Sequence, residues 1–454
     1  MSIFKAYDIR GIVDDTLTPE IVTKIGQAIG SEAAQRDQAK VVVARDGRLS
    51  GPDLIEALIT GLQMAGREVI DIGMMPTPLL YFATFYLKTG TGVMLTGSHN
   101  PPNYNGLKIM IAGETLSEDS IQALKKRIDT NDLITSDGSR HVADVHHAYI
   151  SNIHKDIKLD RPFKVVVDCG NGVAGAIAPH LIEVLGCKVV KLFCEVDGNF
   201  PNHHPDPSVP KNLEDLINTV QSEGADLGLA FDGDGDRLGV VDATGEIIWP
   251  DRQMILYATD LLQRKPGSEI IYDVKCSNHL ASAIEQQGGK ATMWKTGHSL
   301  IKSKMRSTGA LLAGEMSGHI FFKERWYGFD DAIYTAARLL EILAKDKRSP
   351  TEVFASLPNS VNTPELKLEL EEFGEHYELM DKVRNTFKFA DAKISTVDGI
   401  RADFADGWGL VRPSNTTPCL VIRFEADNQT VLETIQNQFR QQFLTIDNTL
   451  KLPF

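Results

Sequence analysis

The sequence predicts an α/β protein made of several consecutive domains, and three observations support this fold class. The chain has 454 residues, whereas one domain usually has about 150. Runs rich in valine and isoleucine alternate with segments of helical periodicity, a pattern typical of sheets whose strands are buried on both faces. The same cycle of strands and helices occurs three times, and each cycle ends in a loop rich in glycine and polar residues.

Each cycle contains three strands separated by helical segments. The predicted strands are residues 41–44, 68–72 and 93–96 in the first cycle, 164–168, 188–193 and 227–231 in the second, and 269–274, 290–294 and 310–313 in the third. The predicted helices are residues 53–65 in the first cycle, 176–185 and 213–223 in the second, and 279–287 and 300–307 in the third. The final strands lead into TGSHNPP, DGDGDR and GEMSGH. Because open α/β sheets bind ligands beyond the carboxyl ends of their strands, we expect these three loops to line one cleft.

The last part of the chain breaks this pattern and predicts a smaller α+β domain. Its antiparallel strands are expected at residues 365–370, 393–397, 399–404 and 419–425, and its helices at residues 376–386 and 430–443. The four expected domains are residues 1–148, 149–252, 253–358 and 359–454.

The composition excludes several classes of partner. Lysine and arginine total 47 against 61 aspartate and glutamate, a formal net charge of -14, so the whole-molecule field repels nucleic acid and anionic membranes. No run approaches the roughly 18 apolar residues of a membrane span. The 5 cysteines form no CxxC pair, which argues against a disulfide framework or a structural zinc site. We therefore expect a protein of the reducing cytoplasm, with neither nucleic acid nor membrane as partner.

FDGDGDR places three carboxylates, on Asp232, Asp234 and Asp236, at alternate positions after a strand. Carboxylate oxygens are hard ligands that suit Mg²⁺ or Ca²⁺, and the intervening glycines allow a tight loop. An EF-hand would need glycine at the sixth position and glutamate at the twelfth, where this chain has Arg237 and Ala243. The motif thus favours a magnesium site open to a phosphate oxygen, the alternative being a solvated Asp-Gly turn.

GNGVAG, residues 170–175, suggests a different class of protein. It matches the dinucleotide-binding pattern G-x-G-x-x-G between a strand and a helix, and Glu195 and Asp197 lie near the place of a ribose-binding acid. A tight turn that packs a helix on a strand gives the same pattern. A Rossmann-type NAD-dependent dehydrogenase is therefore kept as an alternative.

The other loops carry polar groups suited to a phosphorylated sugar. TGSHNPP places Ser98 on a glycine turn without the G-x-S-x-G of a hydrolase, and the adjacent His99 has poor geometry for its base. RPSNTTP, residues 412–418, combines a guanidinium, hydroxyls and an amide that suit a compact phosphate, and the chain has no Walker A sequence. GEMSGH offers Glu315 and Ser317 to vicinal hydroxyls. Ordinary polar turns are the alternative for TGSHNPP and for RPSNTTP taken singly.

Together, these motifs resemble those of the α-D-phosphohexomutase superfamily, most closely its bacterial phosphomannomutase/phosphoglucomutase branch. The resemblance runs through YDIRG, TGSHNPPNYNGLK, DGDGDR, VKC, TGHSLIK, GEMSGH and RPSNTTP, in this order over the whole chain. It implies three α/β/α domains with mixed sheets and a fourth, TATA-binding-protein-like α+β domain around a central cleft. GNGVAG is then structural.

The resemblance also implies roles for individual residues. Ser98 would carry a phosphoryl group and share Mg²⁺ with Asp232, Asp234 and Asp236. The other catalytic residues would be Arg10, Lys108, Arg237 and His319. The substrate-binding residues would be Tyr7, Lys275, His298, Glu315, Ser317, His319, Arg412, Ser414, Asn415 and Thr416. The general base stays open among His99, His319 and Lys108.

The implied reaction interconverts mannose 1-phosphate and mannose 6-phosphate, through a phosphoserine enzyme and a hexose 1,6-bisphosphate that also serves as activator. Mannose and glucose differ only at C2, so a site that holds O3 and O4 is expected to accept glucose phosphates too. A phosphoglucomutase or a phosphoglucosamine mutase is the alternative within the superfamily. Met316 stands where phosphoglucosamine mutases tend to have glutamine, which makes an amino-sugar substrate less favoured. The resemblance suggests a place in GDP-mannose biosynthesis.

Overall fold

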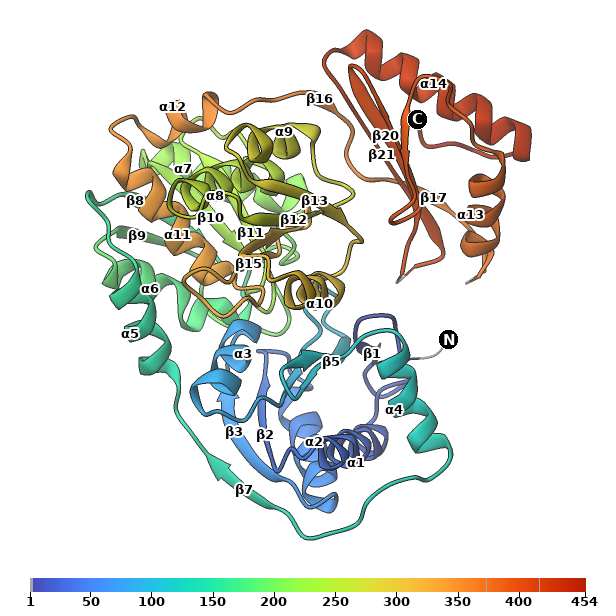
Figure 1. The fold of residues 1–454 in the computed structure, drawn as a ribbon. Coiled ribbons are helices and arrows are strands. Elements are labelled where there is room, and N and C mark those ends of the chain that lie inside the picture. Colours follow the sequence, from blue (N-terminus) through green and yellow to red (C-terminus); the bar gives the residue numbers. More distant parts are fainter. Residues whose placement is uncertain (1–2, 373, 416) are drawn as a thin grey trace.

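The computed structural model describes residues 3–372, 374–415 and 417–454, and within these ranges the chain forms four sheets (Figure 1). Three sheets follow one another in the part of the chain predicted to be α/β, and the fourth is formed by the C-terminal part. The predicted fold class of three α/β/α domains followed by an α+β domain is confirmed.

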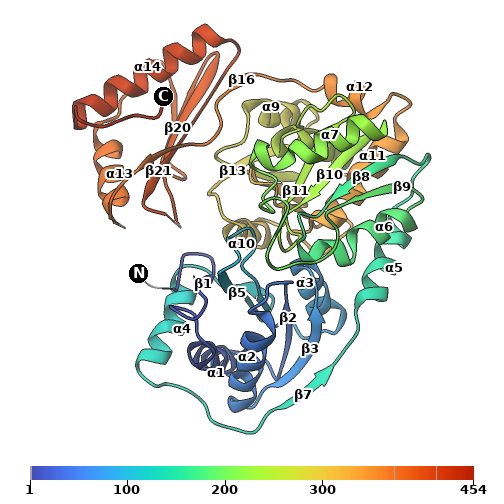
Figure 2. The ribbon, with the colours of Figure 1, turned by 180° about the vertical axis from the view of Figure 1, so that it is seen from behind.

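The first sheet lies at the bottom of Figure 1. Its strands are β1 (Ile9–Ile12), β2 (Lys40–Arg45), β3 (Glu68–Met74), β4 (Gly92–Leu95), β5 (Tyr104–Ile111), β6 (Glu114–Thr115) and β7 (Ser139–Val142). The accompanying helices are α1 (Pro19–Gln35), α2 (Gly51–Met64), α3 (Thr77–Tyr86) and α4 (Asp119–Asp129). From the edge strand β7 the chain passes into α5 (His146–Asp156), which leads to the second domain (Figure 2).

The second and third sheets each have four strands. The second domain contains β8 (Lys164–Asp168), a 3₁₀ turn (Val173–Ala176), α6 (Ala178–Val184), β9 (Lys188–Leu192), a 3₁₀ turn (Pro210–Leu213), α7 (Glu214–Glu223), β10 (Leu227–Phe231) and β11 (Leu238–Asp242). The third contains α8 (Pro250–Arg264), β12 (Glu269–Asp273), α9 (Asn278–Gln286), β13 (Lys290–Trp294), α10 (His298–Thr308), β14 (Leu312–Gly314), β15 (Ile320–Phe322), α11 (Ala332–Lys345) and α12 (Pro350–Ala355). The expected domain boundaries after residues 148 and 252 fall inside α5 and α8.

The C-terminal domain packs two helices on an antiparallel sheet. Its elements are β16 (Val361–Asn362), β17 (Leu366–Glu369), α13 (Glu375–Thr386), β18 (Lys393–Ser395), β19 (Ile400–Phe404), β20 (Gly407–Pro413), β21 (Cys419–Ala426) and α14 (Gln429–Ile446). The sequence analysis missed β20, which pairs with both β19 and β21 at the centre of the sheet.

The three predicted cycles share one strand order. In each, the first strand lies between the second and the third, and a fourth strand pairs antiparallel with the third. The orders are β5-β4-β2-β3, β11-β10-β8-β9 and β15-β14-β12-β13. The loops TGSHNPP, DGDGDR and GEMSGH therefore occupy equivalent places, between the third and the fourth strand of each cycle.

The helix predicted over residues 176–185 is shorter in the structure. Residues Val173–Ala176 form a 3₁₀ turn and α6 begins only at Ala178. Pro179 lies in the first turn of α6, where its missing N–H costs no hydrogen bond, whereas the same residue further inside a helix would break it.

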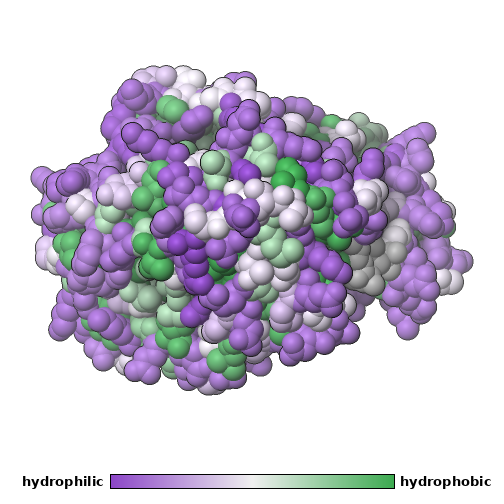
Figure 3. All heavy atoms as spheres, turned by 90° about the horizontal axis from the view of Figure 1, so that it is seen from below, coloured by the Kyte–Doolittle hydropathy of each residue, from purple (hydrophilic) through white to green (hydrophobic). Residues whose placement is uncertain are grey.

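The apolar core is continuous through the first three domains. One cluster extends from Val42 in β2 to Phe354 in α12, and a second cluster fills the other face of the first sheet. The C-terminal domain has its own core. Among the described helices, none has the length and apolarity to span a membrane. The face seen from below carries mostly hydrophilic side chains, broken by separate apolar patches (Figure 3).

Candidate active site

Two of the predicted loops contact each other: TGSHNPP, residues 96–102, called the serine loop, and DGDGDR, residues 232–237, called the aspartate loop. The hydroxyl Oγ of Ser98 lies 3.3 Å from Oδ2 of Asp232 and 3.1 Å from Nδ1 of His99. Ser98 is 4% exposed and has a φ of 48°, a conformation that is rare for a residue with a side chain. Its N–H donates to Oγ1 of Thr96 at 2.8 Å, which helps to hold the serine in place.

The aspartate loop is folded around one of its own carboxylates. Oδ1 of Asp232 accepts hydrogen bonds from the N–H groups of Gly235, Asp236 and Arg237, at 3.0, 3.0 and 3.1 Å. Asp232, Asp234 and Asp236 are all 0% exposed, and one oxygen of each lies within 4.8 Å of the others. The three carboxylates are thus brought to one point inside the protein.

Lys108, on β5, lies between two of these carboxylates. Its Nζ is 2.7 Å from Oδ2 of Asp234 and 2.5 Å from Oδ2 of Asp236. Burial would lower the pKa of Lys108, but the two aspartates hold it well above its ordinary value. The lysine is therefore a fixed ammonium group.

Lys108 compensates only part of the negative charge of the three aspartates. Burial and the neighbouring Asp236 raise the pKa of Asp232 to about 7. Burial and Asp234 raise the pKa of Asp236, whereas Asp234 is held below its usual range because Lys108 outweighs the effect of burial. Oδ1 of Asp234 and Oδ1 of Asp236 are buried without a hydrogen-bond partner. These oxygens fit a hard divalent cation.

Arg237 lies beside this cluster, and the charge of Arg10 acts on His99, next to Ser98. Nε of Arg237 donates to Oδ2 of Asp232 at 3.0 Å and its Nη1 lies 3.4 Å from Asp206, while its Nη2 is buried without a partner. Arg10, on β1, pairs with Asp8 at 2.5 Å. Unused guanidinium donors beside a serine hydroxyl suit a phosphoryl group.

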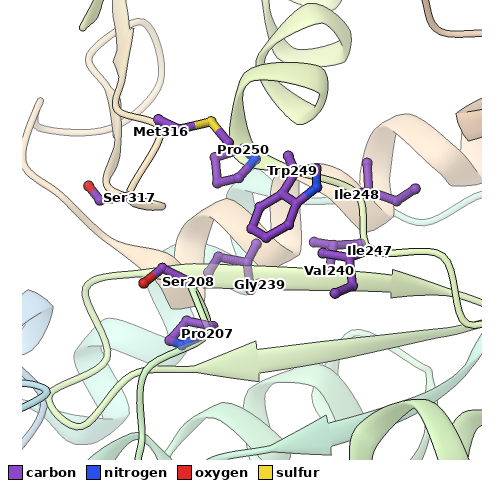
Figure 4. A pocket seen from close by; sticks show the side chains of 11 residues that line it. Pro207, Ser208, Gly239, Val240, Ile247, Ile248, Trp249, Pro250, Met316 and Ser317 are labelled. Atoms are coloured by element: carbon purple, nitrogen blue, oxygen red, sulfur yellow. The ribbon is translucent and has the colours of Figure 1, made fainter. Parts of the chain in front are cut away.

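The loop after β14 carries Glu315, and only one of its two carboxylate oxygens accepts a hydrogen bond. Oε1 of Glu315 accepts the N–H of Gly297 at 2.6 Å, while its Oε2 is buried without a partner. Burial raises the pKa of Glu315 to about 7. Ser317 is half-buried, and with Met316 it lines a crevice that Trp249 also borders (Figure 4). The volume of about 10 Å³ leaves room for a single water at most, so this crevice is not the place of a sugar.

Two predicted histidines share a carboxylate that the sequence analysis missed. Nδ1 of His319 lies 3.2 Å from Oδ2 of Asp330, and Nδ1 of His298 lies 3.6 Å from the same oxygen. Lys302 holds the other oxygen at 2.8 Å. Burial lowers the pKa of His298 well below 6.5, whereas Asp236 and Asp330 overcome burial and raise that of His319.

The C-terminal domain brings a guanidinium to the same region. Nε of Arg412 donates to Oδ2 of Asp398 at 2.8 Å, and Arg412 is 5% exposed. The side-chain amide of Asn415 donates to the hydroxyl of Tyr7, which donates to the carbonyl of Thr296 at 2.9 Å.

The other predicted residues of this region have different surroundings. Oγ of Ser414 lies 2.9 Å from Oγ1 of Thr417, and Thr416 lies outside the described residues. Lys275 pairs across the domain boundary with Glu365, at 2.5 Å.

Comparison with known proteins decides the family. Family models of phosphoglucomutase/phosphomannomutase match in order, as alpha/beta/alpha domain I at residues 1–135, domain II at 143–245, domain III at 249–361 and the C-terminal domain at 361–442. The chain belongs to the phosphoglucomutase/phosphomannomutase family. It is therefore a phosphohexomutase, an isomerase that acts on hexose phosphates.

Individual relatives match over their whole length. A phosphomannomutase/phosphoglucomutase of Pseudomonas aeruginosa is 57% identical over 453 residues, 100% of this chain and 98% of the relative. A phosphoglucomutase of Neisseria gonorrhoeae is 52% identical, with 96% of each chain covered. The crystal structure of a phosphoglucomutase/phosphomannomutase family protein from Burkholderia thailandensis has 51% identity and a TM-score of 0.95, covering 100% of this chain and 99% of that one.

In this member of the family, GNGVAG packs against the aspartate loop. A Cβ at Gly172 would lie 2.9 Å from the backbone of Gly233, and the N–H of Val173 donates to the carbonyl of Gly233 at 3.1 Å. Asp197 accepts the N–H of Asn199, two residues on, at 2.9 Å. The glycines thus have a packing reason that does not involve a dinucleotide.

Several residues of the site escaped the sequence analysis. Thr77 donates to Oδ2 of Asp234 at 2.5 Å, and Asp330 and Asp398 each hold a predicted binding residue. Asp330 precedes Asp331, whose side chain accepts the N–H of Tyr334 at the start of α11. The pair Asp-Asp before an apolar helix was the available signal, but it predicts a helix cap as readily as a site.

Proposed function

We propose that the protein interconverts mannose 1-phosphate and mannose 6-phosphate, and the corresponding glucose phosphates, through a phosphoserine at position 98. The observation that carries the proposal is the position of Ser98 Oγ, 3.3 Å from a carboxylate of a buried triad. The family membership and the relatives named for mannose and glucose phosphates support it further.

The metal would be Mg²⁺, held by Asp232, Asp234, Asp236 and an oxygen of the phosphorylated Ser98. The two buried carboxylate oxygens without a hydrogen-bond partner, Oδ1 of Asp234 and Oδ1 of Asp236, support this ligand set. When bound, Mg²⁺ supplies positive charge that stabilises the phosphoryl oxygens during transfer.

The chain itself supplies the remaining positive charge. Three carboxylates and a phosphoserine of about -1.5 to -2 exceed the charge of one divalent ion, so nearby cations are needed. We assign this role to Lys108, which is fixed between two carboxylates, to Arg237, whose buried Nη2 has no hydrogen-bond partner, and to Arg10. Phosphoryl transfer depends chiefly on such positioning and charge stabilisation.

We assign the general base to His319. Lys108 is held as an ammonium group by its aspartate partners and is a poor proton acceptor. Within the described part of the chain, the side-chain partner of His99 is the serine hydroxyl, whereas Nδ1 of His319 has the carboxylate of Asp330 at 3.2 Å. A carboxylate at one ring nitrogen orients a histidine and raises the basicity of the other nitrogen.

The substrate would be held by groups from three domains. Glu315 and Ser317 would bind O3 and O4 of the sugar, with Tyr7, Lys275 and His298 beside them. The phosphate that is not reacting would be bound by Arg412, Ser414, Asn415 and Thr416.

The reaction has two transfers. A free hydroxyl of the hexose phosphate gives its proton to His319 and attacks the phosphorus of phosphoserine 98. The bond from phosphorus to Oγ breaks, Oγ takes up a proton to become the serine hydroxyl, and a hexose 1,6-bisphosphate forms. The bisphosphate turns over in the site and returns its other phosphate to Ser98. The residues that bind the nonreacting phosphate can accept the phosphate at either C1 or C6 of the sugar. Both transfers therefore use the same enzyme phosphate, and no external phosphoryl donor is consumed.

The test combines mass spectrometry with turnover. We expect intact mass and peptide mapping to find phosphate on Ser98, and Ser98→Ala to lose at least about 10³-fold in kcat with mannose 1-phosphate and glucose 1-phosphate alike. Ser222→Ala, an exposed serine on α7, is the matched control and keeps full activity. Full isomerising speed in Ser98→Ala would refute the proposal. Strict rejection of glucose 1-phosphate would refute the dual specificity.

A further inference from the structure

Arg48 is a charged residue buried directly beneath the serine loop. It follows β2 in the sequence RDGR and is 1% exposed. Its guanidinium donates to four backbone carbonyls of the loop: Ser98 at 2.8 Å, Asn100 at 2.7 Å, Pro101 at 2.6 Å and Tyr104 at 2.8 Å. One side chain thus holds the carbonyl of the reacting serine and three carbonyls that follow it.

Asp46 completes this arrangement on the other side of the loop. Its Oδ2 accepts hydrogen bonds from Nε of Arg48 at 3.2 Å, from Oγ1 of Thr96 at 2.8 Å and from the N–H of Gly97 at 3.1 Å. Thr96 in turn accepts the N–H of Ser98 at 2.8 Å. The backbone of Ser98 is therefore fixed at its N–H through Asp46 and at its carbonyl through Arg48.

Gly97 allows the guanidinium to approach this closely. A Cβ at position 97 would lie 2.3 Å from Cζ and from Nε of Arg48. Any side chain at position 97 would therefore displace the arginine or the loop. This contact gives the glycine of TGSHNPP a physical reason that the sequence alone did not reveal.

The conformation of Ser98 needs such support. A non-glycine residue with positive φ costs of the order of 1–3 kcal/mol and persists only where its surroundings over-determine it. Four hydrogen bonds from one planar, rigid group can do this, whereas a lysine ammonium cannot match the same fork geometry.

We propose that Arg48 is a positioning residue for phosphoryl transfer, holding Ser98 in its strained conformation facing the aspartate triad. The inference rests on the proposed function of Ser98. Arg48 contacts backbone carbonyls rather than substrate, so its loss should slow transfer and leave substrate binding nearly unchanged.

The experiment compares Arg48→Ala and Arg48→Lys with the wild type in kcat, KM and the rate at which hexose 1,6-bisphosphate phosphorylates Ser98, followed by intact mass. We expect kcat and the phosphorylation rate to fall at least about 100-fold in both variants, since a misplacement of about 1 Å can cost that much. KM should stay within about threefold. Free guanidinium should restore part of the activity of Arg48→Ala and none of that of Ser98→Ala.

Arg338→Lys is the control for the loss of a buried arginine. Arg338 is 0% exposed and pairs with Asp260 at 3.0 Å on α8, away from the loops of the site. It should lower the melting temperature and keep kcat. If Arg48→Lys melts lower but keeps kcat within threefold, Arg48 is only structural and the inference fails. Activity that survives in Ser98→Ala would instead refute the proposed function.

Discussion

Lys108→Met tests whether the aspartate triad is an unbalanced cluster of buried charge. The substitution keeps a long apolar side chain but removes the ammonium group that lies 2.7 and 2.5 Å from two fully buried carboxylates. Removing one partner from a buried ion pair costs about 3–5 kcal/mol. For a cooperative unit of about 360 residues, 1 kcal/mol corresponds to about 1.3 °C, so the melting temperature in EDTA should fall by roughly 4–7 °C.

Added Mg²⁺ should reverse much of this loss, because it takes over the charge of the missing ammonium. At about 100 times its Kd, a ligand that binds only the folded state returns about 2.7 kcal/mol. The assay is thermal unfolding in EDTA and in a Mg²⁺ titration. Lys125→Met removes an ion pair of the same length, 2.5 Å to Asp129, that is exposed on α4, and it should cost less than about 1 kcal/mol. Equal losses in the two variants in EDTA would refute the reasoning.

Three further predictions concern other parts of the molecule. Burial raises the pKa of Asp331 from 3.8 to about 7, so the folded state keeps a proton that the unfolded chain releases. Asp331 should therefore lower stability by up to about 4 kcal/mol between about pH 4 and 7, at about 1.4 kcal/mol per pKa unit. In urea unfolding, Asp331→Asn should lose this share of the pH dependence, while Asp232 and Glu315, whose pKa values are also raised to about 7, keep theirs. Gly172→Ala should lower kcat, because the added methyl group would move Gly233 of the aspartate loop. Adding NAD should leave the melting temperature of the protein unchanged; an increase in melting temperature with NAD would support the dehydrogenase alternative. Arg412→Ala should raise KM about 10- to 100-fold for hexose 1- and 6-phosphates alike, and an effect on only one isomer would contradict a shared phosphate site.

Much of the fold could be predicted because the valine- and isoleucine-rich strands are buried on both faces and stand out in the sequence. The fourth strand of each cycle was harder to find. In β5, polar residues such as Lys108 interrupt the apolar pattern, because this strand supplies side chains to the site. In β20, glycines at 407 and 409 hide a strand that only its neighbours on both sides stabilise.

The candidate site also contains some residues that could be predicted from the sequence and others that could not. The closeness of Ser98 to the three aspartates could be predicted, because both loops follow buried strands and carry distinctive sets of residues. Arg48 and Asp330 could not, since a charged residue in an isolated sequence is expected at the surface. Their burial arises only when loops from different parts of the chain close over them.

The distribution of the apolar cores determines which parts of the molecule should unfold together. The first three domains share one apolar cluster, so they should lose structure together, whereas the C-terminal domain has a separate core. It joins the third domain through a small apolar cluster of Val274, Trp408 and Leu410, and through buried hydrogen bonds such as those from Arg401 to backbone carbonyls of that domain. Calorimetry should resolve two cooperative units rather than four. The smaller unit can then lose its structure while the aspartate loop and Ser98 stay in register on the larger one.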